Sequence, residues 1–389
     1  MPANTTQDRS RLKILFYTHG LVDGGGERLW ACLATAFKDR GYDVGVVVDF
    51  EAEDNRHNLH PDIPLHVLGK GHIGAVMRLA KLLREERPDI TLAAIGGSNI
   101  KLLAANLLAG RPTTPIISYH GECEYRSGIL SYLSYIGLPI ISRIAPKTIA
   151  VSEGLEQTLV TRWGADPRNI ACIYNPVFFP ENAPVPTPGE LAAREDVILS
   201  VGRFVVEKDF VTLVRAFARM NRRSARLLIL GKGPQMDRVK AEVRRLGIEE
   251  RVSMPGYARE PWQAYRTAKC FVSSSVSEPF GNVVVEALAH GLPVVATACA
   301  GPHEILLHGT HGRIVGLRNE IQMARAIEAT LDNTGDPQSR RERADEFSFE
   351  ARVPLYEALI RDVLAEKTRR ERRIGAAEGA LAANVRRHS

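Results

Sequence analysis

The sequence SEPFGNVVVEALAHGLPVVATACAGPHE, residues 277–304, indicates the fold and the chemistry of this chain more directly than any other stretch. Two carboxylates, Glu278 and Glu286, stand on either side of a turn that contains Gly281. Upstream, the run CFVSSS predicts a strand that ends near Ser274. We therefore expect a strand, a tight turn, and a helix that starts near Gly281.

A helix start of this kind suits a phosphate group. Its first backbone N–H groups have no partner within the helix, and the helix dipole is positive at this end. The flanking carboxylates cannot bind phosphate, but they suit sugar hydroxyls on either side of it. The local chemistry thus favours a sugar nucleotide laid across the turn.

The same segment resembles the donor-site signature of the retaining family-four glycosyltransferases, which contains the spacing E-x7-E. Other stretches fit the family in the order in which the family has them, over roughly residues 12–350. They are GGGERL (24–29), SYHGE (118–122), IAVSEGL (149–155), IYNPV (173–177), VGR (201–203), EKD (207–209), TLVRAFA (212–218), LLILGKGP (227–234) and VSMPGY (252–257). An E-x7-E alone is weak evidence, whereas the ordered set is specific.

Strand-like apolar runs alternate with helical patterns along the chain, which predicts an α/β fold with parallel, doubly wound sheets. A stretch with four prolines, residues 178–190, interrupts the alternation and reads as a linker. The resemblance implies the GT-B architecture, two Rossmann-like domains that face each other across a cleft, with a C-terminal helix that returns to the first domain. We expect an acceptor-binding domain at 1–180, a linker at 181–190, a nucleotide-sugar-binding domain at 191–350, and a crossover helix with a basic tail at 351–389.

The resemblance assigns roles to individual residues. Arg203 and Lys208 correspond to the pair that binds the donor diphosphate, where two fixed cations would stabilise the charge that develops on the leaving group. Glu278 corresponds to the glutamate that contacts the 3- and 4-hydroxyls of the donor sugar, and Glu286 to the one that holds the ribose. His120 corresponds to a histidine near the sugar 6-hydroxyl, which would position the substrate.

Five more positions belong to the expected donor site. The backbone N–H groups of Phe280, Gly281 and Asn282 should reach the sugar and the diphosphate. By the resemblance, Gly25 corresponds to the loop that contacts the diphosphate after the cleft closes, and Tyr257 to the loop beside the nucleobase. Without the resemblance, the same residues also fit a solvated loop pair, a flexible turn and a structural histidine.

A nicotinamide dehydrogenase is an alternative, because Asp49 ends a predicted strand where a ribose-binding acid would sit. However, residues 24–29 lack the third glycine of the dinucleotide fingerprint. This alternative would also leave Arg203, Lys208 and Glu278 without a role.

Composition and motifs argue against several other classes of protein, among them zinc proteins, secreted proteins and membrane-spanning proteins. Hydrophobic residues make up 44% and charged residues 25% of the chain, as in ordinary globular proteins. Five scattered cysteines without a C-x-x-C pair indicate reduced thiols in the cytosol and no zinc site. No Asp-x-Asp follows a predicted strand, so we expect no metal and no cofactor. The first ten residues do not form a signal peptide, and no apolar run reaches the ~18 residues that span a bilayer.

The net charge of +6 raises the question of an anionic partner. The pattern at 72–87 predicts a helix with basic residues beside an apolar face, residues 128–145 are apolar and aromatic, and the tail contains KTRRERR (367–373). Such patches suit anionic lipid surfaces, although the tail also fits a solvated final helix. No nucleic-acid-binding module is present.

We therefore expect a retaining, metal-independent hexosyltransferase. It would move a sugar from a nucleoside-diphosphate donor, UDP-linked by preference, to a cell-surface glycan or lipid-linked acceptor, in the cytoplasm at the inner face of the membrane. A non-catalytic sugar-nucleotide binding protein and a sugar-nucleotide 2-epimerase on the same scaffold are the alternatives.

Overall fold

The structure is a computed structural model that describes residues 12–22, 24–121, 126, 128–180 and 184–388, with the backbone alone for 375–388. Three features of the sequence lie outside the described residues: the polar start at 1–10, the loop positions Glu122 and Cys123, and the first three residues of the expected linker, 181–183.

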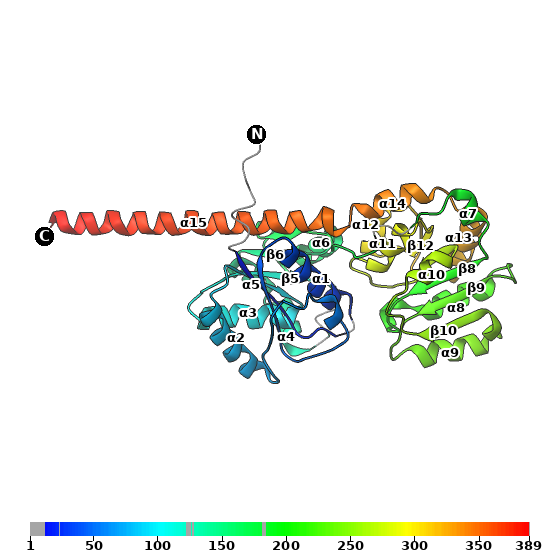
Figure 1. Cartoon of the computed structure of the whole chain (residues 1–389), viewed down its shortest axis with the longest axis horizontal. Helices are drawn as coiled ribbons and strands as arrows, with labels where there is room; N and C mark the ends of the chain where they lie inside the picture. The colour runs from blue at the N-terminus through cyan, green and yellow to red at the C-terminus, as the bar shows by residue number, and fades with distance from the viewer. Residues whose placement is uncertain (1–11, 23, 122–125, 127, 181–183, 389) are drawn as a thin grey trace.

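The N-terminal half is a parallel sheet with helices on both faces (Figure 1). Its strands are nearly continuous apolar runs such as DVGVVV, as expected for strands covered on both sides. The seven described strands lie in the order β3-β2-β1-β4-β5-β6-β7. In chain order the elements are β1 (Lys13–Thr18), α1 (Gly25–Asp39), β2 (Asp43–Val48), η2 (Arg56–Asn58), β3 (Leu65–Val67), α2 (His72–Glu86), β4 (Ile90–Ala94), α3 (Gly96–Leu108), β5 (Thr114–Tyr119), α4 (Ile129–Ile136), α5 (Leu138–Ile144), β6 (Lys147–Ala150), α6 (Glu153–Thr161) and β7 (Ile170–Cys172).

The C-terminal half repeats this architecture with six described parallel strands in the order β10-β9-β8-β11-β12-β13. We propose that the division between the halves falls at 181–190. The elements are α7 (Pro188–Ala192), β8 (Val197–Val201), η4 (Val206–Lys208), α8 (Phe210–Arg219), β9 (Arg226–Leu230), α9 (Met236–Arg245), η5 (Glu249–Arg251), β10 (Val252–Gly256), α10 (Trp262–Thr267), β11 (Cys270–Ser273), α11 (Asn282–Ala289), β12 (Val294–Thr297), α12 (Ala300–Ile305), η6 (Leu307–Gly309), β13 (Arg313–Val315), α13 (Glu320–Asp332) and α14 (Pro337–Asp345).

The strand orders locate the site. The first sheet changes its winding direction between β1 and β4, and the second between β8 and β11. Ligands of doubly wound sheets bind outside the carboxyl ends of the strands at such a point. Since β8 and β11 are paired neighbours, the turn with Arg203 and Lys208 lies beside the turn with Glu278.

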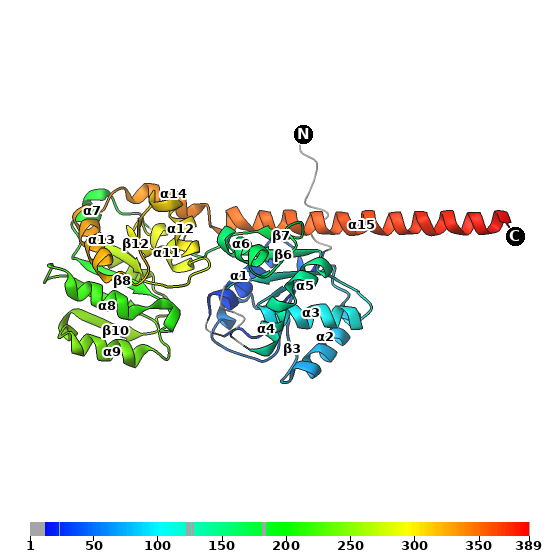
Figure 2. The same ribbon diagram turned by 180° about the vertical axis from the view of Figure 1, so that it is seen from behind.

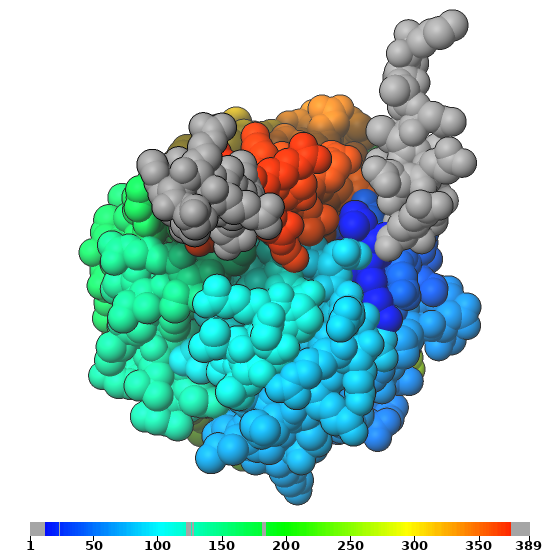
Figure 3. All heavy atoms as spheres, turned by 90° about the vertical axis from the view of Figure 1, so that its left-hand side faces the viewer, coloured from blue at the N-terminus to red at the C-terminus, as the bar shows by residue number. Residues whose placement is uncertain are grey.

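The last helix, α15 (Phe349–His388), starts in the C-terminal half and runs across the N-terminal half (Figures 1 and 3). Four of its residues, Val353, Tyr356, Ile360 and Val363, are buried in the core that α1 forms with the first sheet. This confirms the predicted pair of doubly wound domains and the returning helix. The basic cluster at 367–373 lies beyond this contact and is exposed.

The predicted helix at 72–87 is α2, and Leu79, Ala80 and Leu83 are buried as its pattern indicates. Ile73, which the pattern places on the same apolar face, is instead 83% exposed. The apolar stretch at 128–145 forms two short helices, α4 and α5. Across the part of the chain that the structure describes, none of the helices has both the length and the apolar character needed to cross a bilayer.

Candidate functional site

The turn between β11 and α11 has the predicted strand-to-helix form. Gly281 caps α11 with a φ of 109°, a conformation that favours glycine, and no described side chain caps this helix end. A Cβ on Gly301, at the start of α12, would lie 1.9 Å from the Phe280 carbonyl oxygen. The backbone N–H of Gly301 donates to the Glu278 carbonyl oxygen at 3.0 Å. Close backbone packing against the start of α12 therefore fixes the turn. The helix start itself has no side-chain cap, so its N–H groups can face a ligand.

A cleft of about 610 Å³ lies between the two halves, in front of this turn. The residues predicted for the site all line it: Gly25, His120, Arg203, Lys208, Tyr257, Glu278, Phe280, Gly281, Asn282 and Glu286. The structure thus brings together residues that are up to 261 positions apart, from Gly25 to Glu286. Their individual roles stay predictions.

Lys208 and Glu278 form an ion pair in the cleft, with side chains 20% and 13% exposed. Ser275 Oγ also donates to Glu278 Oε2 at 3.2 Å, and Ser274 Oγ donates to the Lys208 carbonyl oxygen at 2.8 Å. From the sequence, Lys208 and Glu278 are expected to be separate ligands of phosphate and sugar. In the structure each neutralises the other, so a donor must compete for both.

Arg203 follows β8 at the rim of the same cleft, and its side chain is exposed. Among the described residues no ion pair involves it. The backbone of this turn is tightly packed, since a Cβ on Gly231 would lie 1.9 Å from the Gly202 carbonyl oxygen. An exposed guanidinium on a tightly packed turn suits an anion that arrives with the substrate.

Glu286 is 4% exposed, and its carboxylate has two partners. Tyr265 Oη donates to Oε2 at 2.8 Å, and Arg28 Nη1 lies 3.4 Å from Oε1. Burial raises the pKa of the Glu286 carboxyl above its ordinary value, although Arg28 and Tyr265 each lower it. Arg28 also lies over the ring of Trp262, with 5.8 Å between the guanidinium carbon and the ring centroid.

The start of α1 faces the start of α11 across the cleft. No described side chain caps α1, and a Cβ on Gly25 would lie 3.4 Å from Asn282 Nδ2. Asn175 Nδ2 donates to Asn282 Oδ1 at 3.4 Å from the same side as α1. Two positive helix ends therefore point into one cleft, which favours an anionic group between them.

His120 lies next to the first turn of α1, where a Cβ on Gly26 would be 3.9 Å from the His120 Cβ. Its Nε2 lies 2.9 Å from Ser118 Oγ, and its ring contacts Trp30 edge to face at 5.3 Å. Burial lowers the pKa of His120 to about 4. The imidazole is therefore neutral near pH 7 and suits hydrogen bonding to a hydroxyl better than proton donation.

Tyr257 lies in the turn after β10 and is half exposed. Lys232 Nζ lies 5.2 Å from its ring centroid. The exposed ring face at the rim of the cleft is available for stacking on a planar group such as a nucleobase.

Two family models match the chain in succession: Glycosyltransferase Family 4 matches residues 23–178, and Glycosyl transferases group 1 matches residues 187–347. The chain is a family-four glycosyltransferase. Together the two models span every described strand except β1, and they include every predicted site residue, which confirms the resemblance stated from the sequence.

Similar proteins include two curated relatives and one solved structure. The lipopolysaccharide core biosynthesis glycosyltransferase LpsE of Rhizobium meliloti is 27% identical over 364 residues, which cover 90% of this chain and 99% of LpsE. A diphospho-undecaprenol 4-alpha-N-acetylgalactosaminyltransferase of Campylobacter jejuni is 27% identical over 265 residues, 66% of this chain and 71% of that protein. Anabaena HepE, solved in complex with UDP and glucose, matches with a TM-score of 0.74 and 22% identity over 91% of this chain and 99% of HepE. This likeness confirms the GT-B fold.

In this family-four glycosyltransferase Asp49 is not a ribose-binding acid, so the dehydrogenase alternative is wrong. Its carboxylate accepts from Tyr17 Oη at 2.8 Å, lies 2.6 Å from His19 Nδ1, and forms a buried ion pair with Lys101. A buried carboxylate with three partners is already satisfied. Asp49 therefore stabilises the edge of the first sheet and takes no part in the donor site.

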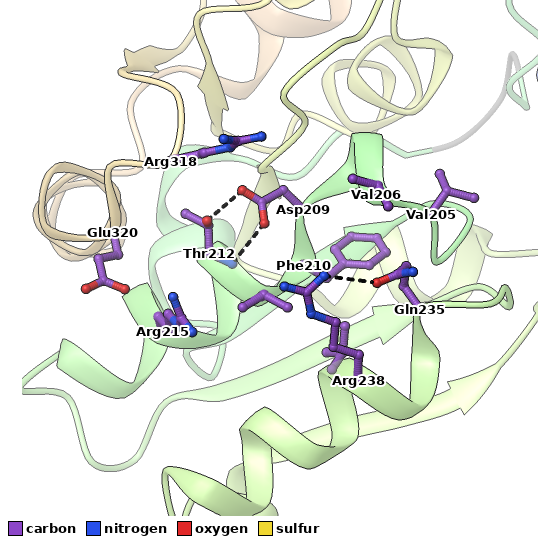
Figure 4. Close-up of a pocket in the computed structure, with 12 residues that line it drawn as sticks. Val205, Val206, Asp209, Phe210, Thr212, Arg215, Gln235, Arg238, Arg318 and Glu320 are labelled. Carbon is purple, nitrogen blue, oxygen red and sulfur yellow. Dashed lines mark hydrogen bonds between the residues drawn. The ribbon is translucent and has the colours of Figure 1, made fainter. Parts of the chain in front are cut away.

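A second hollow, of about 510 Å³, lies on the outer side of the 205–209 turn (Figure 4). It shares Val205 with the cleft but is lined by α8 and α9, among whose residues Arg238 lies beside Phe210. Neither Glu278 nor Glu286 reaches it. None of the residues predicted for the donor site lines the outer hollow, which therefore supplies control positions for mutagenesis.

Sequence reasoning missed two residues that contact Glu286. Arg28 stands in the quoted stretch GGGERL, to which the resemblance assigns a role only at Gly25. Its charge next to the glycine turn was the available signal. Nothing in the sequence indicated that Tyr265 belongs to the site, because an aromatic residue in a short helix is typical of a hydrophobic core. Glu304, the last residue of the stretch 277–304, accepts from the backbone N–H groups of Glu153 and Gly154 at 2.9 and 2.8 Å, and so joins the two halves outside the cleft.

Proposed function

We propose that this enzyme transfers a hexose, with retention of anomeric configuration and without a metal ion, from a UDP-sugar to a cell-surface glycan or lipid-linked acceptor. Transfer would take place at the cytoplasmic face of the membrane. The family assignment supports sugar transfer from a nucleotide-sugar donor. The donor base, the sugar, the acceptor and the location are our inference.

One observation carries the proposal: two uncapped helix starts and two cations converge between two carboxylates. The starts of α1 and α11, with Arg203 and Lys208, line the cleft. Glu278 and Glu286 lie on either side of the Gly281 turn. A diphosphate with a sugar at one end and a ribose at the other matches this order of charges.

The chemistry follows from where charge develops. As the glycosidic bond breaks, negative charge grows on the leaving diphosphate, and Arg203, Lys208 and the helix N–H groups are placed in advance to stabilise it. Glu278 would hold sugar hydroxyls after Lys208 turns from it to the phosphate. In a same-face reaction, the departing phosphate oxygen takes the proton of the incoming hydroxyl, so the protein need not supply a base.

Relatives support the choice of substrates. HepE was solved with UDP and glucose, LpsE is named for lipopolysaccharide core biosynthesis, and the Campylobacter relative is named for a diphospho-undecaprenol acceptor. These names favour a UDP-hexose donor and an acceptor that carries a lipid.

The experiment has two stages. A thermal-shift screen over UDP, GDP, ADP and their common sugars identifies the donor, and proton NMR of the product formed with membrane lipid extract then gives the anomeric configuration. We expect a UDP-sugar to stabilise the protein most and the product to retain the donor configuration. An inverted product would refute the proposed mechanism. Nucleotide release without transfer would favour a binding protein, and isomerised donor in the absence of acceptor would favour an epimerase.

A further inference from the structure

Helices α4 and α5 bury three serines and expose six large apolar side chains, while Tyr135 and Leu138 pack into the core. Ser131, Ser134 and Ser142 are buried, whereas six large side chains are between 44% and 64% exposed: Ile129, Tyr132, Leu133, Ile136, Ile140 and Ile144. A helix on the surface of a globular protein normally has the reverse pattern. An exposed apolar surface of this kind marks an interaction site.

The six side chains form one stripe, which we call the α4–α5 face. Their spacing of three or four residues places neighbours on the same side of the helices. The opposite side is fixed by close packing, since a Cβ on Gly96 of α3 would lie 3.2 Å from the Ser131 Cα. Tyr119 Oη also lies 2.6 Å from Ser134 Oγ. The helices therefore cannot turn their apolar side inward without losing these contacts.

Two exposed arginines flank this face, Arg126 and Arg143, at the two ends of the segment. No Asp or Glu occurs between residues 128 and 152, although Arg143 Nε lies 3.7 Å from Oδ2 of the buried Asp166. The helix layer continues from α4 through α3 to α2 on the same side of the sheet (Figure 2). There Ile73 and Met77 are exposed too, on the helix that carries the basic residues noted from the sequence.

We propose that the α4–α5 face docks onto an anionic lipid bilayer and lies in the interface without crossing it. A stripe of isoleucine and leucine with a tyrosine and flanking arginines has the chemistry of interfacial helices. A second copy of this chain fits less well, because a symmetric contact through the same face would bring like charges together.

The position of this face relative to the cleft indicates a role for docking in sugar transfer. This role rests on the proposed function. Leu130 and Ser131 of α4 lie beside Gly97, in the first turn of α3. Ile95, just before that turn, lines the cleft. A bilayer on the α4–α5 face would hold the acceptor side of the cleft close to the headgroups, where the sugar end of a lipid-linked acceptor lies.

The test is flotation of the full-length protein with vesicles of phosphatidylethanolamine and phosphatidylglycerol, without donor or acceptor. The double variant Ile136→Glu/Ile140→Glu changes two exposed residues, so its fold should be kept. The matched control, Leu317→Glu/Ile321→Glu, changes two similarly exposed residues of the C-terminal half. A third variant that lacks residues 366–389 measures the contribution of the basic tail.

We expect the α4–α5 variant to lose vesicle binding by about tenfold or more, since interfacial binding scales with buried apolar area, and the control to bind like the wild type. Tail removal should weaken binding further only through charge.

Equal binding of the wild type and the α4–α5 variant, no wild-type binding, or equal loss in the control would overturn the proposal. Self-association that the α4–α5 variant abolishes while vesicle binding stays unchanged would assign the face to a second copy. Because the assay contains no substrate, its outcome is independent of whether transfer is found.

Discussion

Arg28 Nη1 lies 3.4 Å from Glu286 Oε1, and this contact joins α1 of the N-terminal half to α11 of the C-terminal half. Glu286 is the predicted ribose ligand, and its side chain is 5% exposed, against 31% for Arg28. The contact therefore links the charge of the Glu286 carboxylate to the approach of the two halves of the chain.

The buried Glu286 predicts how nucleotide binding depends on pH. Its carboxyl pKa is raised by burial, so the group is charged above that pKa and protonated below it. Affinity for free nucleoside diphosphate should therefore be full at higher pH and fall as the pH drops through a range above the usual glutamate pKa of about 4.3. Calorimetry over a pH series checks this. An affinity that stays constant down to the ordinary glutamate range would argue against Glu286 as a ligand.

Substitution of Arg28 should move this transition. Arg28→Ala removes a charge that lowers the pKa of Glu286, so nucleotide affinity should be lost at a higher pH than in the wild type. Arg28→Lys keeps the charge and serves as the control. If both variants lose affinity at the wild-type pH, the ion pair has no part in donor binding.

Substitutions of Glu278 and Glu286 should affect the binding of different parts of the donor. Glu278→Gln should reduce transfer strongly and leave the affinity for free nucleotide nearly unchanged, because Glu278 is expected to contact the sugar. Glu286→Gln should weaken free nucleotide by about 1–3 kcal/mol, the range for a charge-assisted hydrogen bond lost in a buried site. Calorimetry with nucleotide alone and with intact donor distinguishes the two. The reverse pattern would mean that the donor lies the other way round in the cleft.

Transfer should not require a divalent cation. The diphosphate would be neutralised by Arg203, Lys208 and two helix starts, which replace the charge that a metal supplies elsewhere. Turnover in the presence of EDTA should equal turnover in its absence. Activity that a chelator abolishes and magnesium or manganese restores would contradict this part of the account.

The sequence predicted the fold because its signals are local. The apolar runs define the strands, and the glycine at 281 defines the turn before α11. The cleft could be predicted because paired parallel strands bring their carboxyl ends together. The Lys208–Glu278 pair and the Arg28–Glu286 contact could not, because each depends on side-chain directions across 70 and 258 positions. The apolar stretch at 128–145 was expected to suit a lipid surface, but its exposed side chains could not be predicted, since periodicity does not tell which side of a helix is buried.

The central claim is that the cations of the 203–208 turn stabilise a leaving diphosphate during sugar transfer. Lys208→Ala and Arg203→Ala should each reduce turnover by about two to three orders of magnitude, as loss of a preorganised charge stabiliser does. Arg238→Ala, on the outer side of the same turn, is the matched control.

The most direct measurement is the rate at which label from a UDP-hexose enters lipid-linked glycan in these variants, each checked for folding. The account predicts wild-type incorporation for Arg238→Ala and loss of about two to three orders of magnitude for Lys208→Ala. Near wild-type incorporation by folded Lys208→Ala and Arg203→Ala variants would contradict it.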